Sequence, residues 1–157
     1  FRRVLLPLDD SALARSVLCP VSRVAEPGAQ LVLLTVIEPS AWQSRPNDGD
    51  AVPDEREREA AATAWLEEAA EPLRAVGFDV RTRVTVSRRC AHEILAAARD
   101  LDADMIALAT HGRSPLARAA MGSVADEVVH GSEAPVLLHH PRPDAPGRTA
   151  SHEEGWR

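Results

Sequence analysis

Lysine is absent from the sequence, and all 18 basic residues are arginines. A Walker-type phosphate-binding lysine and a Schiff-base lysine are therefore excluded. Aromatic residues are also scarce, at 3% of the chain with no tyrosine, so a set of rings for stacking is not expected. A core must come from Val, Leu, Ile and Ala instead, which is typical of a buried parallel sheet covered by helices.

The charge balance and the apolar segments argue against two classes of partner. The net charge is −6, whereas binding to a nucleic-acid backbone requires a concentrated positive face. No apolar run reaches the roughly 20 residues of a membrane-spanning helix. The apolar start FRRVLLPLDD is too short for a signal sequence and is interrupted by proline. We expect a cytoplasmic protein that binds neither nucleic acid nor a membrane, and the start at Phe1 leaves open whether residues or a domain precede it.

The cysteines and the paired histidines do not form a recognisable metal-binding pattern. Cys19 and Cys90 lie in separate predicted helices without a CxxC or Cys/His spacing. A metal site or a disulfide framework is therefore not expected, and a reducing compartment is the simplest interpretation. Both thiols are expected to be small buried residues. His139 and His140 are adjacent on a predicted strand and point to opposite faces, which disfavours a metal site there.

Short apolar runs alternate with segments of helical periodicity along the chain. The apolar patterns predict strands at residues 4–8, 30–37, 80–86, 105–109 and 135–139. Apolar residues at helical spacing predict helices at residues 12–24, 54–76, 90–101 and 123–131. The segment 39–53 is rich in Pro, Gly, Asn and Asp and is expected to form an exposed loop. We predict one domain over residues 1–140 and a disordered polar tail over residues 141–157.

The alternation of strands and helices defines the expected fold class, α/β. Right-handed crossovers between successive units produce an open parallel sheet with helices on both faces. In such sheets a ligand binds at the carboxyl ends of the strands, where the winding direction switches. For a sheet that begins at its centre, the loops after the first and fourth strands meet at this point. These loops contain PLDDS, residues 7–11, and ATHGRSPLARAAMGS, residues 109–123.

The second of these loops has the composition of a phosphate-binding segment. Gly112 follows a buried strand, where the missing Cβ permits a positive φ and a close approach of backbone N–H groups to a ligand. Gly122 and Ser123 open a helix whose first N–H groups are unpaired and favour an anion. Arg113 or Arg118 could supply counter-charge. The segment therefore has the outline of a phosphate cradle.

The same residues have a structural alternative. Gly112 could simply turn the chain, and Ser123 could cap the helix with Asp126 as part of a capping box. Asp9 could likewise be a turn residue beside a serine that caps the first helix. His111 has no Ser, Cys or carboxylate partner that the sequence places beside it, so a structural role in the loop is favoured over acid–base chemistry.

Several segments together resemble the universal stress protein family. The resemblance rests on PLDDS after the first strand, LLTVIEP at the second, and ATHGRS, MGSVADEVV and APVLLHH toward the end, and it covers residues 2–140. The ATP-binding branch carries the motif Gly-x2-Gly-x9-Gly-Ser/Thr, to which Ala109, Gly112, Gly122 and Ser123 correspond. The resemblance implies a Rossmann-like, adenine nucleotide alpha hydrolase-like fold with a five-stranded parallel sheet in the order 3-2-1-4-5. It also implies a homodimer through the last strand, Pro135 to His139.

The resemblance further implies ATP as the ligand, with Mg²⁺ or Mn²⁺ as an option on the phosphates. Asp9 would bind the ribose hydroxyls, Val36 would contact the adenine edge through its backbone, and glycines 112 and 122 with Ser123 would hold the phosphates. The complete set of predicted binding residues is Pro7, Leu8, Asp9, Val36, Ala109, His111, Gly112, Arg113, Gly122, Ser123 and Val124. The chain departs from the family at Ala109, which replaces the first glycine of the motif, and at residues 88–90, where Arg-Arg-Cys stands in place of Gly-x-Pro.

Three functions remain to be compared. The first is a cytoplasmic regulatory module of stress responses that binds ATP, has no catalytic residues and hydrolyses ATP slowly at most. The second is a dimer that has lost the nucleotide and acts as a protein-interaction scaffold. The third, an enzyme of the related adenine nucleotide hydrolase and ligase group, is disfavoured because its Ser-Gly-Gly loop is absent from PLDDS. AMP or a cyclic nucleotide stays open as the ligand.

Overall fold

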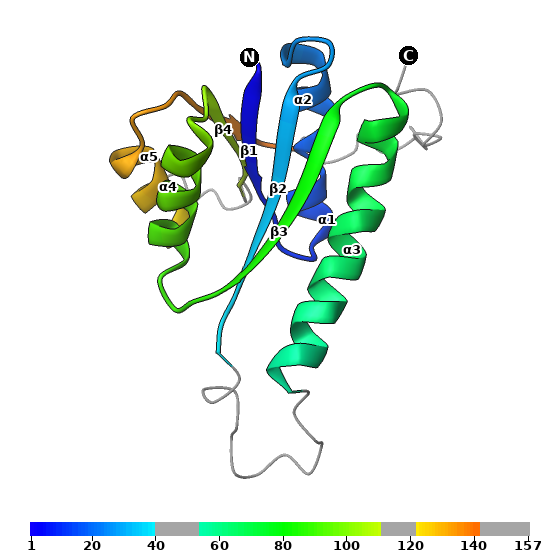
Figure 1. Cartoon of the computed structure of the whole chain (residues 1–157). Helices are drawn as coiled ribbons and strands as arrows, with labels where there is room; N and C mark the ends of the chain where they lie inside the picture. The colour runs from blue at the N-terminus through cyan, green and yellow to red at the C-terminus, as the bar shows by residue number, and fades with distance from the viewer. Residues whose placement is uncertain (40–53, 111–121, 142–157) are drawn as a thin grey trace, which may run out of the picture.

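The computed structural model describes residues 1–39, 54–110 and 122–141 (Figure 1). Three segments lie outside the described residues. They are residues 40–53 of the loop predicted at 39–53, residues 111–121 of the glycine segment, and residues 142–157 of the tail predicted at 141–157. The described elements are β1 (Arg3–Pro7), α1 (Ala12–Arg15), α2 (Leu18–Val24), β2 (Gln30–Ile37), α3 (Glu55–Ala75), β3 (Asp79–Val86), α4 (Cys90–Leu101), β4 (Met105–Ala109), α5 (Ser123–Gly131) and β5 (Val136–His139).

The described strands form one parallel sheet in the order β3-β2-β1-β4-β5. This confirms the predicted fold class and strand order. The chain begins at the centre with β1, runs outward to β3, and then crosses back to β4 on the other side of β1. The winding direction therefore reverses between β1 and β4, which is where such sheets bind ligands.

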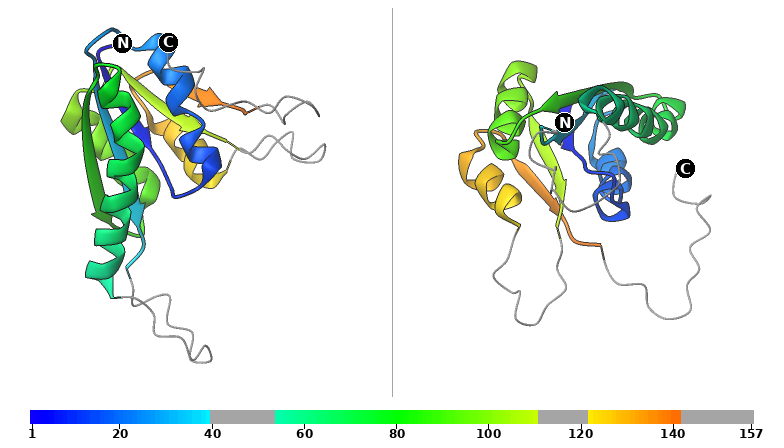
Figure 2. Two further views of the ribbon diagram at one scale, coloured as in Figure 1. Left: turned by 90° about the vertical axis from the view of Figure 1, so that its right-hand side faces the viewer. Right: turned by 90° about the horizontal axis from the view of Figure 1, so that it is seen from below.

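Helices cover both faces of the sheet (Figure 2). The helices α1, α2 and α3 lie on one face, where the core includes Leu6, Leu33 and Leu73. The helices α4 and α5 lie on the other face, where it includes Leu5 and Ile106. The largest fully buried side chains are aliphatic, as the composition predicts. None of the described helices is both long and apolar enough to cross a bilayer.

The predicted first helix is wrong in one respect, because it consists of two helices. α1 ends at Arg15 and α2 begins at Leu18. Pro20 explains the break, since a proline ring clashes with the carbonyl four residues before it, here that of Ser16. At the end of α1 the N–H of Ser16 donates to the carbonyl of Leu13, three residues before it, at 3.0 Å, which closes a short turn. α1 is therefore a single turn that follows directly from the β1–α1 loop.

A polar network attaches α3 to the edge strand β3. The Arg74 guanidinium donates to the Glu67 carboxylate at 2.7 Å and, from Nε and Nη2, to the carbonyl of Val80 at 3.3 and 3.1 Å. The Thr82 hydroxyl donates a short hydrogen bond to the same carboxylate. Arg74 first, and Thr82 second, hold the pKa of Glu67 below its ordinary value. The network thus joins the helix to an outward-facing carbonyl of the strand.

The two cysteines are only partly buried, which corrects the expectation that both are buried. Cys19 lies on α2 beside Leu18 and two residues before Val21, the buried residues of that helix, so it sits at the border of the buried face. Cys90 is the first residue of α4 and borders a cavity. In both cases the exposure follows from the position of the residue on its helix.

Candidate functional site

The two central strands separate at the switch point. β1 pairs with β2 along its full length, up to Pro7 opposite Leu34. On its other side β1 pairs with β4 only at Val4 and Leu5. Pro7 has no N–H with which to continue a ladder, so it suits the position where pairing stops. A crevice therefore opens between β1 and β4 at the carboxyl edge of the sheet.

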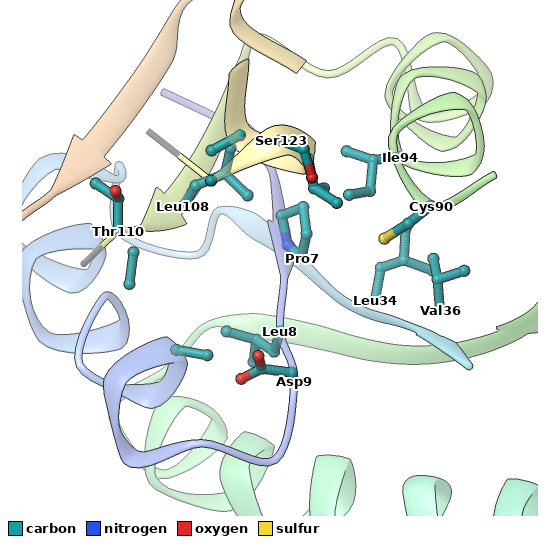
Figure 3. A pocket seen from close by; sticks show the side chains of 15 residues that line it. Pro7, Leu8, Asp9, Leu34, Val36, Cys90, Ile94, Leu108, Thr110 and Ser123 are labelled. Carbon is teal, nitrogen blue, oxygen red and sulfur yellow. The ribbon is translucent and has the colours of Figure 1, made fainter. Parts of the chain in front are cut away.

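This crevice contains a cavity of about 380 Å³ (Figure 3). Its size falls in the range of small-molecule sites. The described residues that line it come from β1, α1, β2, α4, β4, α5 and their loops. They are Pro7, Leu8, Asp9, Ala14, Leu34, Val36, Cys90, Ile94, Leu108, Ala109, Thr110, Gly122, Ser123, Val124 and Ala125.

One wall of the cavity is apolar. Leu34 and Val36 from β2 and Ile94 from α4 lie together on one side of the cavity, and Leu108 from β4 lies apart from them, near Thr110 (Figure 3). Leu34, Ile94 and Leu108 belong to the core on the α4–α5 face and are nearly inaccessible to solvent. Aliphatic walls of this kind can bury an uncharged ring, because contact with apolar surface removes the ring from water.

The Cys90 thiol adds no charge to this wall. A cysteine at the start of a helix ordinarily has a lowered pKa. Here burial, followed by the carboxylates of Asp9, Glu127 and Glu38, raises the pKa of Cys90 above its ordinary value. The thiol is therefore neutral at neutral pH, and the apolar wall carries no thiolate.

Asp9 places a carboxylate at the mouth of the cavity. Its Oδ1 accepts a hydrogen bond from the N–H of Ser11 at 3.1 Å, and the Ser11 hydroxyl accepts one from the N–H of Ala14 at 3.0 Å to cap α1. Within the described part of the chain Oδ2 has no hydrogen-bond partner. The turn role and the predicted ligand role of Asp9 are therefore compatible, because the turn uses only one of the two oxygens.

The backbone before Asp9 is anchored to β2. The N–H of Leu8 donates to the carbonyl of Leu34 at 2.8 Å. The carbonyl of Leu8 accepts a hydrogen bond of 2.7 Å from the hydroxyl of Thr35, whose side chain is 5% exposed. Both polar groups of Leu8 thus point to the same neighbouring strand. The position of Asp9 is fixed from its N-terminal side by these two bonds and from its C-terminal side by the Ser11 turn.

The N-terminus of α5 faces the same cavity. Gly122 is the N-cap, with extended backbone angles of φ −52° and ψ 149°, and no side chain caps the helix. The alternative that Ser123 is the cap is therefore wrong, because Ser123 is the first residue inside the helix. The N–H of Asp126 donates to the carbonyl of Gly122 at 2.9 Å, which leaves the earlier N–H groups of the helix without intrahelical partners. A Cβ at Gly122 would meet no atom within 4 Å, so the space in front of it is open.

The alanine that replaces the first glycine of the motif is accommodated by the fold. Ala109 is the last residue of β4, pairs with His139 of β5, and packs against the core on the α1–α3 face. The next residue, Thr110, is 5% exposed, and its N–H donates to the carbonyl of His139 at 3.0 Å. Burial, together with His140, lowers the pKa of His139. The end of β4 is therefore held by β5, whereas β1 no longer pairs with β4 at this level of the sheet.

The structure brings together every described member of the predicted binding set. Those around the cavity are Pro7, Leu8, Asp9, Val36, Ala109, Gly122, Ser123 and Val124. His111, Gly112 and Arg113 lie outside the described residues. The sequence prediction missed seven lining residues, namely Ala14, Leu34, Cys90, Ile94, Leu108, Thr110 and Ala125. The sequence gives little indication that these residues line a site, because most of them are apolar and have the same pattern as ordinary core residues.

The described residues offer little for metal binding or catalysis at this site. No group of three or more His, Cys, Asp or Glu side chains in the described ranges could hold a metal ion. Asp9 is the only carboxylic acid among the described lining residues, and no histidine accompanies it there. The arrangement can bind a molecule that has an apolar ring, hydroxyl groups and an anionic group, and it presents no nucleophile–base pair among these residues.

The sequence and the fold match known proteins over most of the chain. The model of the Universal stress protein family matches residues 1–140. Among solved structures, hypothetical protein MJ0577 is 26% identical, with a TM-score of 0.71 over 92% of this chain and 99% of that one. A universal stress protein in complex with cAMP is 22% identical, with a TM-score of 0.65 over 89% of this chain and 97% of that one. The Archaeoglobus fulgidus universal stress protein in complex with dAMP is 19% identical, with a TM-score of 0.59 over 88% and 97% of the two chains. No curated protein matches the sequence.

Proposed function

Because this chain belongs to the universal stress protein family, we propose that it is a cytoplasmic regulatory module of stress responses that binds ATP between the ends of β1 and β4. The observation that carries this proposal is the joining of three chemically different surfaces in one cavity. An apolar wall, a carboxylate with a free oxygen and an uncapped helix N-terminus match the base, the ribose and the phosphates of a nucleotide.

The base fits the apolar wall formed by Leu34, Val36 and Ile94. This wall has no ionised group, because the Cys90 thiol keeps its proton at neutral pH. The backbone of Val36, near the end of β2, supplies the hydrogen-bonding groups that the adenine edge requires. Recognition of adenine rather than guanine would depend on these main-chain groups, since the side chains of the wall are apolar.

The phosphates fit the N-terminus of α5. Its first N–H groups point outward from the helix and its dipole favours negative charge. The absent side chain of Gly122 leaves room for a close approach, and the Ser123 hydroxyl adds a donor. Arg113 supplies counter-charge in the proposal. Mg²⁺ or Mn²⁺ would be held mainly through the phosphates, because the described residues supply no cluster of metal ligands.

The proposal assigns the protein a binding role rather than a catalytic one. Hydrolysis of the nucleotide requires a positioned water or nucleophile and a base to activate it. The Asp9 carboxylate, the one acid in the described lining, is allotted to the ribose. ATP hydrolysis is therefore expected to be slow at most, and nucleotide occupancy would act by changing the contacts with a partner.

We include a homodimer through β5 in the proposal. β5 is an edge strand of the sheet, and all of its residues are partly exposed. The N–H of Thr110 donates to the carbonyl of His139, so the main-chain groups of His139 point toward β4. Because successive residues of a strand point their main-chain groups to opposite sides, those of Val136 and Leu138 point to the free edge of the sheet. Replacing Val136 and Leu138 by aspartate should convert the dimer to a monomer in sedimentation. A wild-type chain that already sediments as a monomer would contradict this part.

The direct test of nucleotide binding is to purify the protein without added nucleotide, denature it and identify what is released. Isothermal titration with ATP, AMP and cAMP then measures affinities for the emptied protein; cAMP belongs in the series because one neighbour of similar fold was solved with it. Gly122→Val should abolish binding by filling the open space before α5, and Ser123→Ala should weaken it by removing one donor. Ser22→Ala, which removes a hydroxyl on α2 away from the cavity, is the matched control.

Two results would contradict the proposal. Wild-type affinity in both Gly122→Val and Ser123→Ala would contradict the assignment of the phosphates to the N-terminus of α5. No released ligand and no thermal shift with millimolar ATP and magnesium would favour the alternative, a dimeric scaffold that has lost its nucleotide. A thermal unfolding curve for Gly122→Val, compared with that of the wild type, separates lost binding from lost folding.

A further inference from the structure

The main-chain groups of β1 alternate between its two neighbours. The carbonyl of Arg2 accepts from Gln30 of β2 at 2.8 Å, and the carbonyl of Arg3 accepts from Asp104, just before β4, at 2.9 Å. The N–H of Leu8 donates to β2 again. Even-numbered residues of β1 therefore direct their main-chain groups to β2, and odd-numbered residues direct theirs to β4.

Asp9 is the first odd-numbered residue after Leu5 that has an N–H to donate. Pairing between β1 and β4 ends at Leu5, and Pro7 has no N–H. The N–H of Asp9 makes no hydrogen bond within the described part of the chain. The alternation therefore leaves one main-chain donor on the open side of β1, beside the cavity that Asp9 also lines.

Thr35 sets the direction of this donor. The Leu8 carbonyl and the Asp9 N–H belong to one planar trans peptide, in which the two groups point in opposite directions. The buried Thr35 hydroxyl holds the carbonyl on the β2 side at 2.7 Å. The Asp9 N–H is thereby turned away from β2 and toward the crevice. Without the hydroxyl, the carbonyl would lose its side-chain donor and the peptide plane would be free to tilt.

We propose that the Asp9 main-chain N–H is a second ligand-binding group. Together with the free carboxylate oxygen of Asp9, this N–H binds a vicinal diol. Thr35 is the positioning residue that orients the N–H. The inference rests on the proposed nucleotide function, in which only the carboxylate was assigned to the ribose. A carboxylate can only accept a hydrogen bond and an N–H can only donate one. In a pair of adjacent hydroxyls, one can donate to the carboxylate oxygen while the other accepts from the N–H, so a vicinal diol gives each of the two Asp9 groups its own partner.

This arrangement makes the site selective for a ribonucleotide. A 2′-deoxynucleotide keeps one hydroxyl and leaves either the N–H or the carboxylate oxygen without a partner. A single hydrogen bond of this kind changes an affinity by about five- to tenfold. We therefore expect the wild-type protein to bind AMP about five- to tenfold more tightly than dAMP.

The experiment compares wild type, Thr35→Val and Thr35→Ser by isothermal titration with AMP and dAMP. Thr35→Val removes the hydroxyl and keeps a branched side chain, whereas Thr35→Ser keeps the hydroxyl and loses a methyl group. We expect Thr35→Val to reduce the preference for AMP over dAMP toward unity and Thr35→Ser to retain it. A merely structural role of Thr35 would weaken both nucleotides equally, so the ratio of the two affinities identifies positioning.

Nuclear magnetic resonance supplies a second readout that does not depend on affinity. The Leu8 carbonyl carbon of the nucleotide-free protein should shift in Thr35→Val and not in Thr35→Ser. The Asp9 amide proton of the wild type should move downfield on addition of AMP, with a smaller change for dAMP. An AMP/dAMP ratio of one in the wild type, or an unchanged ratio in a folded Thr35→Val, would overturn this inference alone. A wild type that binds neither nucleotide would overturn the proposed function as well.

Discussion

Replacing Asp9 by asparagine separates the turn role of its side chain from the ribose contact that we propose for it. Asparagine keeps a carbonyl oxygen that can accept from the Ser11 N–H, as Oδ1 does now at 3.1 Å, so the turn and the cap of α1 survive. At the other position an NH₂ group replaces the free oxygen and presents a donor where an acceptor stood. The substitution therefore removes the proposed contact to a ligand hydroxyl while the loop keeps its hydrogen bonds.

The expected loss of ligand affinity in Asp9→Asn follows from the exposure of the Asp9 side chain. A hydrogen bond to a charged group contributes about 1.5–3 kcal/mol. Asp9 is exposed, so the lower end applies, and about 1.5 kcal/mol corresponds to a roughly tenfold loss of affinity. Unfolding by urea should be unchanged for Asp9→Asn. Asp9→Ala, which also removes the acceptor for Ser11, should lower the free energy of unfolding by about 0.5–1.5 kcal/mol.

The assay is isothermal titration of AMP into Asp9→Asn, with Asp10→Asn as the matched control. Asp10 bonds Arg15 at 3.0 Å and does not line the cavity, so its neutralisation tests the effect of charge near the loop. Wild-type affinity in Asp9→Asn would refute the ribose contact. Equal losses in the two variants would show that general charge, and not the free oxygen of Asp9, determines the affinity.

Three further predictions concern stability and reactivity. Leu66 of α3 is fully buried, so Leu66→Ala should lower the free energy of unfolding in urea by about 2–5 kcal/mol, whereas Ala64→Ser on the exposed side should change it by less than about 0.5 kcal/mol. Because the folded pKa of Glu67 is lowered, its stabilisation should be complete above about pH 5 and disappear as the pH falls through the folded pKa. Unfolding curves of wild type and Glu67→Gln should therefore differ at pH 7 and converge in acid, and a constant difference would contradict the linkage. Because the pKa of Cys90 is raised, its alkylation by iodoacetamide should be slow at pH 7, accelerate with pH, and be slowed by ATP. Mass spectrometry that finds Cys90 modified equally fast with and without saturating ATP would place the nucleotide elsewhere.

The sequence predicts the strands well because their patterns and boundaries have physical causes. The continuous apolar run of β2 reflects burial on both faces, and the alternation in β3 reflects an edge position with exposed Arg81 and Arg83. The helices are less well determined. Ala61 and Ala64 match the apolar spacing of α3, yet both are exposed while Ala62 is buried, because alanine is small enough for either side of a helix.

The sequence likewise predicts only some of the residues of the candidate site. Residues in the loops after β1 and β4 are predictable, because the carboxyl ends of parallel strands around a switch point must meet. The sequence does not predict the apolar lining residues Leu34, Ile94 and Leu108, because an apolar side chain has the same pattern whether it faces a packed core or a cavity. The difference depends on how far β1 and β4 separate, which is a property of the folded sheet. The role proposed for Thr35 likewise rests on its hydrogen bond to Leu8, which only the folded structure shows.

The proline at the end of the central strand has a consequence for the empty protein. Two bare strand edges that face each other can join when nothing lies between them, and a binding site made in this way would have to be pulled apart by each arriving ligand. Pro7 removes one of the donors that such joining would need, while β5 holds the other edge in place. The crevice is therefore open in the protein without a ligand, and a ligand that entered it would lose no binding free energy in separating β1 from β4.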